Sequence, residues 1–357
     1  MDKENVTIEL RNLTTGYHAK KQDIIVSNGL NAKLRMGEMT CLLGPNGAGK
    51  STLLRTLAAF QPSIGGDVLL MNRNLKNYKN GELSHLISVV LTDNSRIRNM
   101  TAYDVVAIGR SPYTGFWGKL SEKDKKIVEK CLQWVGITEL AERKMQTLSD
   151  GERQKVMIAK AIAQETPIIF LDEPTAFLDY PSKIGMMLLL HRLAKALKKT
   201  IFLSTHDLEH ALQVADQVWL IDREKGLTTG MPEDLCAEGK IEEYFMRDGI
   251  SFDRATCTFG VRHDTAREVI VEGNKEGMEY RLVCKAFIRN AIRPVDTSEN
   301  NDVKVVIPGD GTYRMWEYGK ETVCVRKIEH IVSVTASTLV KTHIKAVRDA
   351  ANMTPYE

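Results

Sequence analysis

The stretch GPNGAGKST, residues 44–52, decides the fold of the first part of the chain. It matches the pattern G-x-x-x-x-G-K-[ST] between Gly44 and Ser51. The apolar run GEMTCLLG leads into it, and STLLRTLAAF, which has the composition of a helix, follows. A glycine-rich turn between a strand and a helix is typical of an α/β domain that binds phosphate. The sequence therefore predicts a nucleoside triphosphate site at this turn.

The residue types in this loop suit phosphate binding. Gly44, Gly47 and Gly49 allow a tight turn whose backbone N–H groups point at phosphate oxygens. The N-terminus of the following helix adds a favourable dipole. We expect Lys50 to bridge the terminal phosphates and Ser51 to ligate Mg²⁺. The predicted nucleotide contacts in the loop are Gly44, Pro45, Asn46, Gly47, Ala48, Gly49, Lys50, Ser51 and Thr52.

Polar side chains follow two other apolar runs. Asp172 ends the run IIFLD and Glu173 comes next, while His206 follows a run in FLSTHD. An aspartate at a strand end can hold Mg²⁺, usually through water, and the adjacent glutamate can act as general base toward an attacking water. We expect His206 to reach the γ-phosphate or this water from the same sheet edge. The alternatives are a merely polar strand end and a structural histidine.

The motifs described above, together with LTTGYH, AFLD and LSDGE, make residues 5–255 resemble an ATP-binding cassette (ABC) ATPase. GPNGAGKS resembles the Walker A motif, IIFLDE Walker B, AFLD the D-loop, STHD the switch-histidine motif and LSDGE the family signature. The resemblance implies that Tyr17, in LTTGYH, stacks on adenine, although a tyrosine on a strand surface is the alternative. It places Asp179 at a dimer interface.

The resemblance also implies how the chain assembles and what it binds. Ser149 and the N–H of Gly151 in one protomer would contact the γ-phosphate held by Walker A of another. ATP and Mg²⁺ are the expected cofactors, and a homodimer with two composite sites is the expected assembly. Glu173 would be the general base, and Lys50 and His206 would neutralise charge.

Asp150 departs from the family signature, which has glycine at this position. A carboxylate about 4 Å from a phosphate charge would be repelled by roughly 4 kcal/mol at an effective dielectric near 20. We therefore expect Asp150 to turn outward and pair with Arg153 along the helix. A weakened site is the alternative.

A second departure concerns the glutamine that the family carries between Walker A and the signature. No glutamine occurs from Pro62 to Leu132. In VVLTDN, Thr92 or Asp93 occupies the corresponding position and could hydrogen-bond a metal-bound water. Thr92 is therefore included with Ser51 and Asp172 among the predicted metal-site residues.

The length of the chain predicts two domains or three, and its scattered cysteines indicate reduced thiols in a cytosol. The chain has 357 residues, a formal net charge of +3, six cysteines and no CxxC pair. No apolar run is long enough to span a membrane, and nothing indicates a nucleic-acid partner. The predicted fold is an α/β P-loop ATPase with a RecA-like core, antiparallel β and helical subdomains in residues 1–255, the helical part covering about 84–165. Residues 256–357 are predicted to form a small C-terminal α+β part, with the domain itself in residues 256–345 and a frayed tail after it. We expect this domain to be regulatory or to extend the dimer contact, and a purely stabilising role is the alternative.

The segment IGRSPYTGFWGKLSEKD, residues 108–124, resembles ATPases that serve uptake of iron-siderophore, haem or cobalamin. The resemblance implies two polytopic permease subunits and a periplasmic or lipid-anchored binding protein, with this chain on the cytoplasmic face of the inner membrane. Tyr113, Phe116 and Trp117 are predicted to lie where a permease docks, or else to pack the subdomain core. A non-transport ABC ATPase, associated with ribosomes or DNA, and a non-catalytic scaffold cassette are the rival interpretations.

Overall fold

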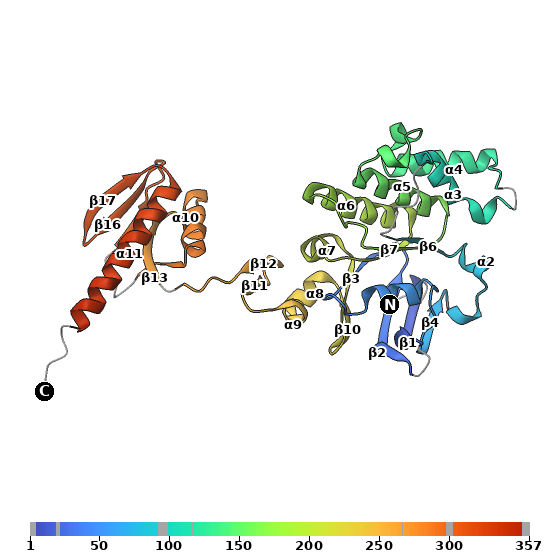
Figure 1. Cartoon of the computed structure of the whole chain (residues 1–357), viewed down its shortest axis with the longest axis horizontal. Coiled ribbons are helices and arrows are strands. Elements are labelled where there is room, and N and C mark those ends of the chain that lie inside the picture. Colours follow the sequence, from blue (N-terminus) through green and yellow to red (C-terminus); the bar gives the residue numbers. More distant parts are fainter. Residues whose placement is uncertain are drawn as a thin grey trace. The chain divides into compact units, whose positions relative to one another are not determined.

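The computed structural model describes residues 5–18, 22–91, 99–115, 118–265, 267–297 and 303–351, with the side chains of the last helix described as far as Lys341. The chain divides into two compact units (Figure 1). The first contains residues 1–248 and 252–260, and the second contains residues 249–251 and 261–357. Each unit is described by itself.

A six-stranded sheet forms the centre of the first unit. Its strands, in spatial order, are β10 (Gly226–Gly230), β9 (Gln217–Asp222), β3 (Met39–Leu43), β8 (Thr200–Ser204), β7 (Ile168–Asp172) and β6 (Ile87–Val90). The strands from β9 to β6 are parallel, and β10 closes the predicted hairpin with β9. The loops after β3, β7 and β8 therefore leave the sheet at one edge, because carboxyl ends of parallel strands coincide.

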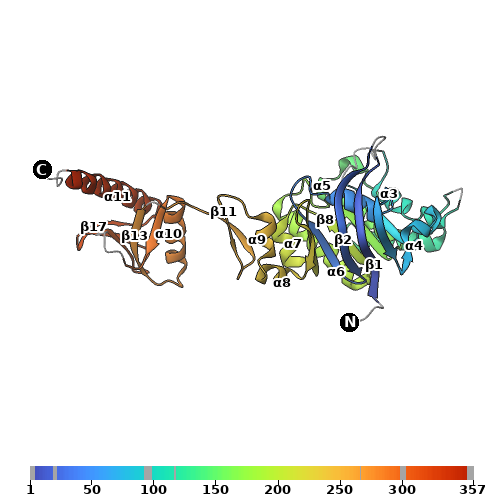
Figure 2. The ribbon, with the colours of Figure 1, turned by 90° about the horizontal axis from the view of Figure 1, so that it is seen from below.

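One face of this sheet packs on an antiparallel sheet. The strands of the antiparallel sheet are β2 (Ile24–Arg35), β1 (Val6–Tyr17), β4 (Gly65–Leu70) and β5 (Arg73–Asn74), and Figure 2 shows β1 and β2 side by side. Helix α1 (Lys50–Leu57) lies in the same layer, and its Leu53 and Leu54 are buried with Phe170 and Trp219. A short helix, α2 (Asn80–Leu83), follows β5.

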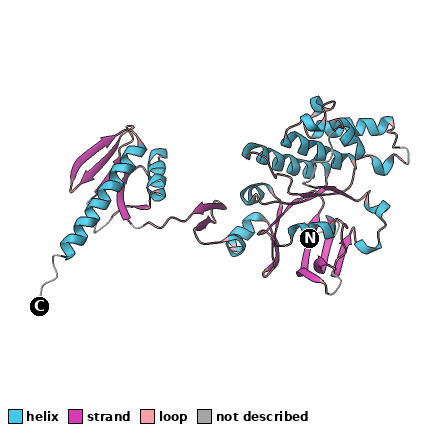
Figure 3. Cartoon of the chain, viewed as in Figure 1, coloured by secondary structure: helices cyan, strands magenta, loops and turns pink. Residues whose placement is uncertain are grey.

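The opposite face of the sheet packs on helices (Figure 3). They are α3 (Ala102–Ile108), α4 (Glu122–Trp134), α5 (Asp150–Ala163), α6 (Tyr180–Leu197), α7 (Leu208–Val214), α8 (Pro232–Ala237) and α9 (Lys240–Phe245). The predicted capping boxes of α3 and α4 are confirmed: Thr101 pairs with Asp104 and Ser121 with Asp124. The prediction of a helical region from about residue 84 is wrong at its start, because buried Ile87 and Val90 form a strand beside β7.

A hairpin extends the first unit beyond residue 255. Strands β11 (Ile250–Asp253) and β12 (Thr258–Val261) bring Phe252 and Phe259 against its core. The Phe259 N–H donates to Glu209 Oε1 on α7 at 3.3 Å. This packing explains why the compact unit reaches Gly260.

The second unit is the predicted α+β fold. Its sheet has the order β14 (Ile292–Val295), β13 (Arg267–Gly273), β15 (Val303–Ile307), β16 (Tyr313–Glu317) and β17 (Lys320–Val325). Helices α10 (Met278–Arg289) and α11 (Ile328–Ala351) pack on one face of it through Phe287 and Ile331. The predicted frayed tail after residue 345 is wrong as far as Ala351, because the backbone of α11 is helical to that residue. Earlier in the helix, Ile331, Val332 and Leu339 are buried in the core of this unit. No helix in the described ranges has the length and apolar content that crossing a bilayer requires.

Candidate active site

The loop after β3 has the backbone that a phosphate cradle needs. Gly47 and Gly49 have φ angles of 78° and 100°, values that glycine adopts at little cost. A Cβ on Gly44 would lie 2.2 Å from the Ile221 carbonyl oxygen, so this position tolerates no side chain without movement. Helix α1 begins directly after Gly49, so its N-terminal N–H groups point into the loop.

Lys50 lies inside this cradle and is 6% exposed. Its Nζ donates hydrogen bonds to the carbonyl oxygens of Gly44 at 2.8 Å and Pro45 at 3.2 Å. Burial lowers the pKa of Lys50, and the negative charges of Glu173 and Asp172 oppose this shift. The lysine is thus held among phosphate-loop carbonyls and close to both predicted carboxylates.

Tyr17 is joined to the first turn of α1. Its hydroxyl lies 2.9 Å from Thr52 Oγ1, while its side chain is 45% exposed at the end of β1. The hydroxyl bond fixes the ring beside the phosphate loop and leaves aromatic surface for a base to stack on.

The carboxylates at the end of β7 are positioned by the neighbouring strand. Ser204 Oγ donates to Asp172 Oδ1 at 2.7 Å. The Glu173 N–H donates to the Ser204 carbonyl oxygen at 3.1 Å, and Glu173 has a φ of 49°. This left-handed turn directs the Glu173 side chain away from the course of the strand. The motif STHD therefore contributes Ser204, which the sequence reasoning did not single out, although its place at the end of β8, two residues before His206, was a usable signal.

His206 and Glu173 are in direct contact. The His206 Nε2 atom lies 2.6 Å from Glu173 Oε1, and both side chains remain partly exposed. The structure thus brings Lys50, Asp172, Glu173 and His206 to one sheet edge, as their positions after parallel strands predict. Thr92 and Asp93 lie outside the described residues.

Ser149 caps α5 as the sequence indicates. Its Oγ accepts from the Glu152 N–H at 3.3 Å, and its own N–H donates to Glu152 Oε2 at 2.8 Å. The predicted Asp150–Arg153 ion pair is confirmed, with 2.5 Å between Arg153 Nη2 and Asp150 Oδ1. The carboxylate therefore faces a cation on its own helix.

The D-loop lies beside the signature turn of the same chain. Asp179 caps α6 by accepting from the Ser182 N–H at 3.0 Å, and this bonding lowers its pKa. A Cβ on Gly151 would lie 3.8 Å from a Leu178 methyl group. Phe177, with a φ of 65°, is 86% exposed. The D-loop thus exposes a large apolar side chain, Phe177, on the surface of the chain.

Comparisons with known proteins agree with this geometry. The family model described as ABC transporter matches residues 27–176. The chain is 42% identical over 257 residues to the uncharacterized ABC transporter ATP-binding protein MJ0873 of Methanocaldococcus jannaschii, covering 72% of this chain and 87% of that protein. The chain belongs to the ABC transporter ATP-binding family.

Two further relatives add detail. The petrobactin import ATP-binding protein FpuD of Bacillus anthracis is 34% identical, over 67% of this chain and 86% of its own length. The ATP-binding cassette MJ0796 was solved as a dimer in a post-hydrolysis state with ADP and Pi. It is 28% identical with a TM-score of 0.53, over 60% of this chain and 94% of that one. As an ABC cassette, the chain binds ATP and is an ATPase.

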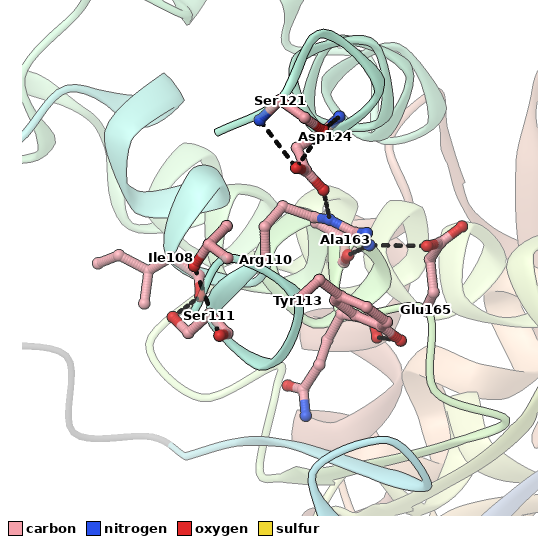
Figure 4. A network of polar contacts seen from close by, with 10 residues as sticks. Ile108, Arg110, Ser111, Tyr113, Ser121, Asp124, Ala163 and Glu165 are labelled. Carbon is pink, nitrogen blue, oxygen red and sulfur yellow. Dashed lines mark hydrogen bonds and ion pairs between the residues drawn. The ribbon is translucent and has the colours of Figure 1, made fainter. Parts of the chain in front are cut away.

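In the segment that resembles siderophore-type ATPases, Arg110 and Asp124 form a buried ion pair, which together with Tyr113 and Glu165 is called the clamp (Figure 4). Arg110 is 2% exposed and donates to Asp124 Oδ1 at 2.9 Å, the Ala163 carbonyl at 2.7 Å and Glu165 Oε2 at 2.7 Å. It therefore joins the start of α4 to the end of the signature helix α5. Hydrogen bonds from Ser121, and then the Arg110 guanidinium, lower the pKa of Asp124 to about 2.

Tyr113 belongs to the same clamp. The guanidinium of Arg110 lies 4.0 Å from its ring centroid, and its hydroxyl donates to the Gln164 carbonyl at 3.0 Å. Tyr113 is 41% exposed and is not among the buried residues of the core, so these contacts do not decide between permease docking and core packing. Phe116 and Trp117 lie outside the described residues, so their docking role stays a prediction.

Replacing Asp150 with Gly tests the outward pose of this side chain. We expect ATP turnover to change by less than about threefold, because the ion pair with Arg153 already offsets the charge. The matched change, Arg153→Ala, should lower turnover by freeing the carboxylate. A gain of about tenfold or more for Asp150→Gly, roughly 1.4 kcal/mol in the barrier, would contradict the outward pose.

Arg223, which the sequence reasoning missed, braces the phosphate loop from the turn after β9. Its Nε donates to the Gly47 carbonyl oxygen at 2.8 Å. We expect Arg223→Ala to raise KM for ATP about fivefold with little change in kcat, because a charged donor holds the loop and takes no part in the chemistry. Steady-state kinetics beside Lys225→Ala, in the same turn, measures this. An unchanged KM, or a kcat that falls as far as KM rises, excludes the bracing role.

Proposed function

We propose that the chain is the ATP-hydrolysing subunit of an importer for an iron complex, siderophore or haem, or for cobalamin. The observation that carries the catalytic part is the meeting of Lys50, Asp172, Glu173 and His206 at one sheet edge. The importer part is supported by the similarity to a petrobactin import protein over 86% of that protein's length. The Gly-Arg-x-Pro segment at residues 109–112 supports the same assignment.

In this proposal each side chain has a distinct role. Glu173 accepts a proton from the attacking water. His206, whose Nε2 lies 2.6 Å from Glu173 Oε1, orients the Glu173 carboxylate and balances charge near the γ-phosphate. Lys50 exchanges its loop carbonyls for terminal phosphate oxygens. Ser51 and Asp172 are the oxygen donors suited to Mg²⁺, which when bound neutralises phosphate charge.

The nucleotide contacts extend across two protomers. We infer that Ser149 and the Gly151 N–H of one protomer contact the γ-phosphate bound to the phosphate loop of its partner, with Asp179 at the same interface. The position of these groups at the N-terminus of α5 supports this, because the positive end of the helix dipole favours an anion. The dimeric solved relative supports the stoichiometry.

The remaining subunits of the proposed importer are separate chains. We propose two polytopic permease subunits, a periplasmic or lipid-anchored binding protein and a place for this chain at the cytoplasmic face of the membrane. In this proposal the permeases supply the passage for the substrate.

Uptake measurements test the proposal. The chain is expressed with its neighbouring permease and binding-protein genes, and uptake of ferric siderophore, haem and cobalamin is compared with a strain carrying Lys50→Ala. We expect one of the three to accumulate only with the wild-type chain. If the chain hydrolyses ATP but copurifies with ribosomes or DNA and not with a permease, the transport assignment is wrong.

A further inference from the structure

The sheet of the second unit has a face that its two helices leave uncovered. Helices α10 and α11 pack with Val269, Val271, Val305 and Met315 in one buried cluster. Side chains alternate between the faces of a strand, so the other face carries Ile270, Glu272, Lys304, Val306, Arg314 and Trp316. These six residues are called the open face.

The open face combines an apolar centre with flanking charges. Ile270, Val306 and Trp316 are half-buried, and the Trp316 Nε1–H is shielded from solvent without an acceptor among the described residues. Lys304 lies 3.1 Å from Glu272, and its Nζ is 5.8 Å from the centroid of the Trp316 ring. An apolar centre with a charged rim is the usual anatomy of a protein interface.

We propose that the open face packs against the open face of a second copy of this chain, about a two-fold axis parallel to β15. β15 is the central strand, with β13 on one side and β16 on the other. Ile270, Lys304 and Trp316 are in register across these three strands, as are Glu272, Val306 and Arg314.

The axis exchanges β13 and β16. Ile270 then meets the partner's Trp316, and Glu272 meets the partner's Arg314. Val306 meets its own copy.

The charges select this axis. On the open face β13 presents Glu272 and β16 presents Arg314, so the exchanged strands are complementary in charge. Within the chain Arg314 also pairs with Asp310, and the neighbouring Glu268 pairs with Arg293. An axis across the strands would instead place Glu272 on the partner's Ile270, which leaves a carboxylate in apolar surroundings. The proposed axis has one unfavourable pair, Lys304 with its copy, and each Lys304 is already paired with Glu272.

A second copy also suits the face better than other partners. A membrane surface or a nucleic acid requires a patch of one sign, whereas both signs occur here.

A cysteine at the axis tests the arrangement. Val306→Cys is introduced into the full chain with Cys324→Ser, which removes the exposed native thiol, and with Lys50→Ala, which removes nucleotide-driven dimerisation. The result is therefore independent of the proposed function. A short bismaleimide, which can bridge the roughly 10 Å between sheets packed face to face, should without nucleotide cross-link this variant at least about tenfold faster than a Leu282→Cys variant, whose position on α10 is exposed. Equal rates for the two variants would overturn the proposal.

A charge exchange gives a second test that a folding defect cannot imitate. In the Lys50→Ala background without nucleotide, Glu272→Arg and Arg314→Glu should each weaken dimerisation about tenfold by sedimentation, and the double variant should restore it. Within one chain β15 separates the two side chains by two strand spacings, about 10 Å, so the restoration requires the partner. A double variant no tighter than the single variants would overturn the pairing.

Discussion

Replacing Glu173 with Gln is expected to lower ATP turnover about 10²–10⁴-fold, the usual contribution of a general base. The amide keeps the size of the side chain and can still contact His206, which lies 2.6 Å from the carboxylate. It cannot accept the proton of the attacking water. ATP binding should persist, because the contacts of the phosphate loop do not involve this side chain.

The expected product of this change is a dimer that closes on ATP and fails to reopen. Size-exclusion chromatography with ATP and Mg²⁺ should show the Glu173→Gln chain as a dimer that retains nucleotide, whereas the wild-type chain exchanges it. Glu224→Gln, a carboxylate of the exposed turn after β9, is the matched control and should turn over ATP at the wild-type rate. Near wild-type turnover in Glu173→Gln would remove Glu173 from the role of base.

The parts of the cassette that the sequence predicts well are those with local causes. The phosphate loop needs glycines because Gly47 and Gly49 have positive φ angles and Gly44 touches Ile221. The capped starts of α3, α4 and α5 follow from side chains three residues apart. The Asp150–Arg153 pair is also local, since both lie on one helix face.

The parts that the sequence misses depend on tertiary contacts. β6 is a short apolar run whose pattern does not distinguish a strand from a helix, and its position beside β7 decides the outcome. Helix α11 is rich in valine and threonine, which have modest helix propensity. Ile331, Thr335 and Leu339 recur at helical spacing and are buried on the sheet, so packing stabilises this helix.

In the candidate site, too, the features with local causes are predicted from the sequence, and the features that depend on tertiary contacts are not. Position after a parallel strand predicts that Asp172 and His206 share an edge. The direct His206–Glu173 contact requires in addition the left-handed turn at Glu173 and the bond from its N–H to Ser204. Arg223 was missed because its loop contact spans 176 residues of sequence.

Replacing Arg110 with Leu is expected to destabilise the cassette by about 3–5 kcal/mol, the usual cost of removing one partner of a buried ion pair. Asp124 would stay buried at 6% exposure with its Arg110 bond lost, and the carbonyl of Ala163 would lose a donor. The Ser121 bonds to Asp124 remain and limit the effect. The first thermal transition should fall by about 6–20 °C for a domain of this size.

The loss should also reach the signature. Arg110 holds the C-terminal end of α5, whose N-terminus is capped by Ser149, so a loosened helix presents the signature less accurately. Arg153→Leu is the matched control: it removes the same type of side chain from an exposed pair and should cost less than about 1 kcal/mol. Calorimetry of both variants measures the difference in stability, and the ATP turnover of Arg110→Leu is compared with that of the wild-type chain. If Arg110→Leu melts within a degree or two of Arg153→Leu, the two variants differ in free energy of unfolding by about 1 kcal/mol or less. In that case the clamp does not stabilise the cassette, and the siderophore-type segment must be explained by contacts outside this chain.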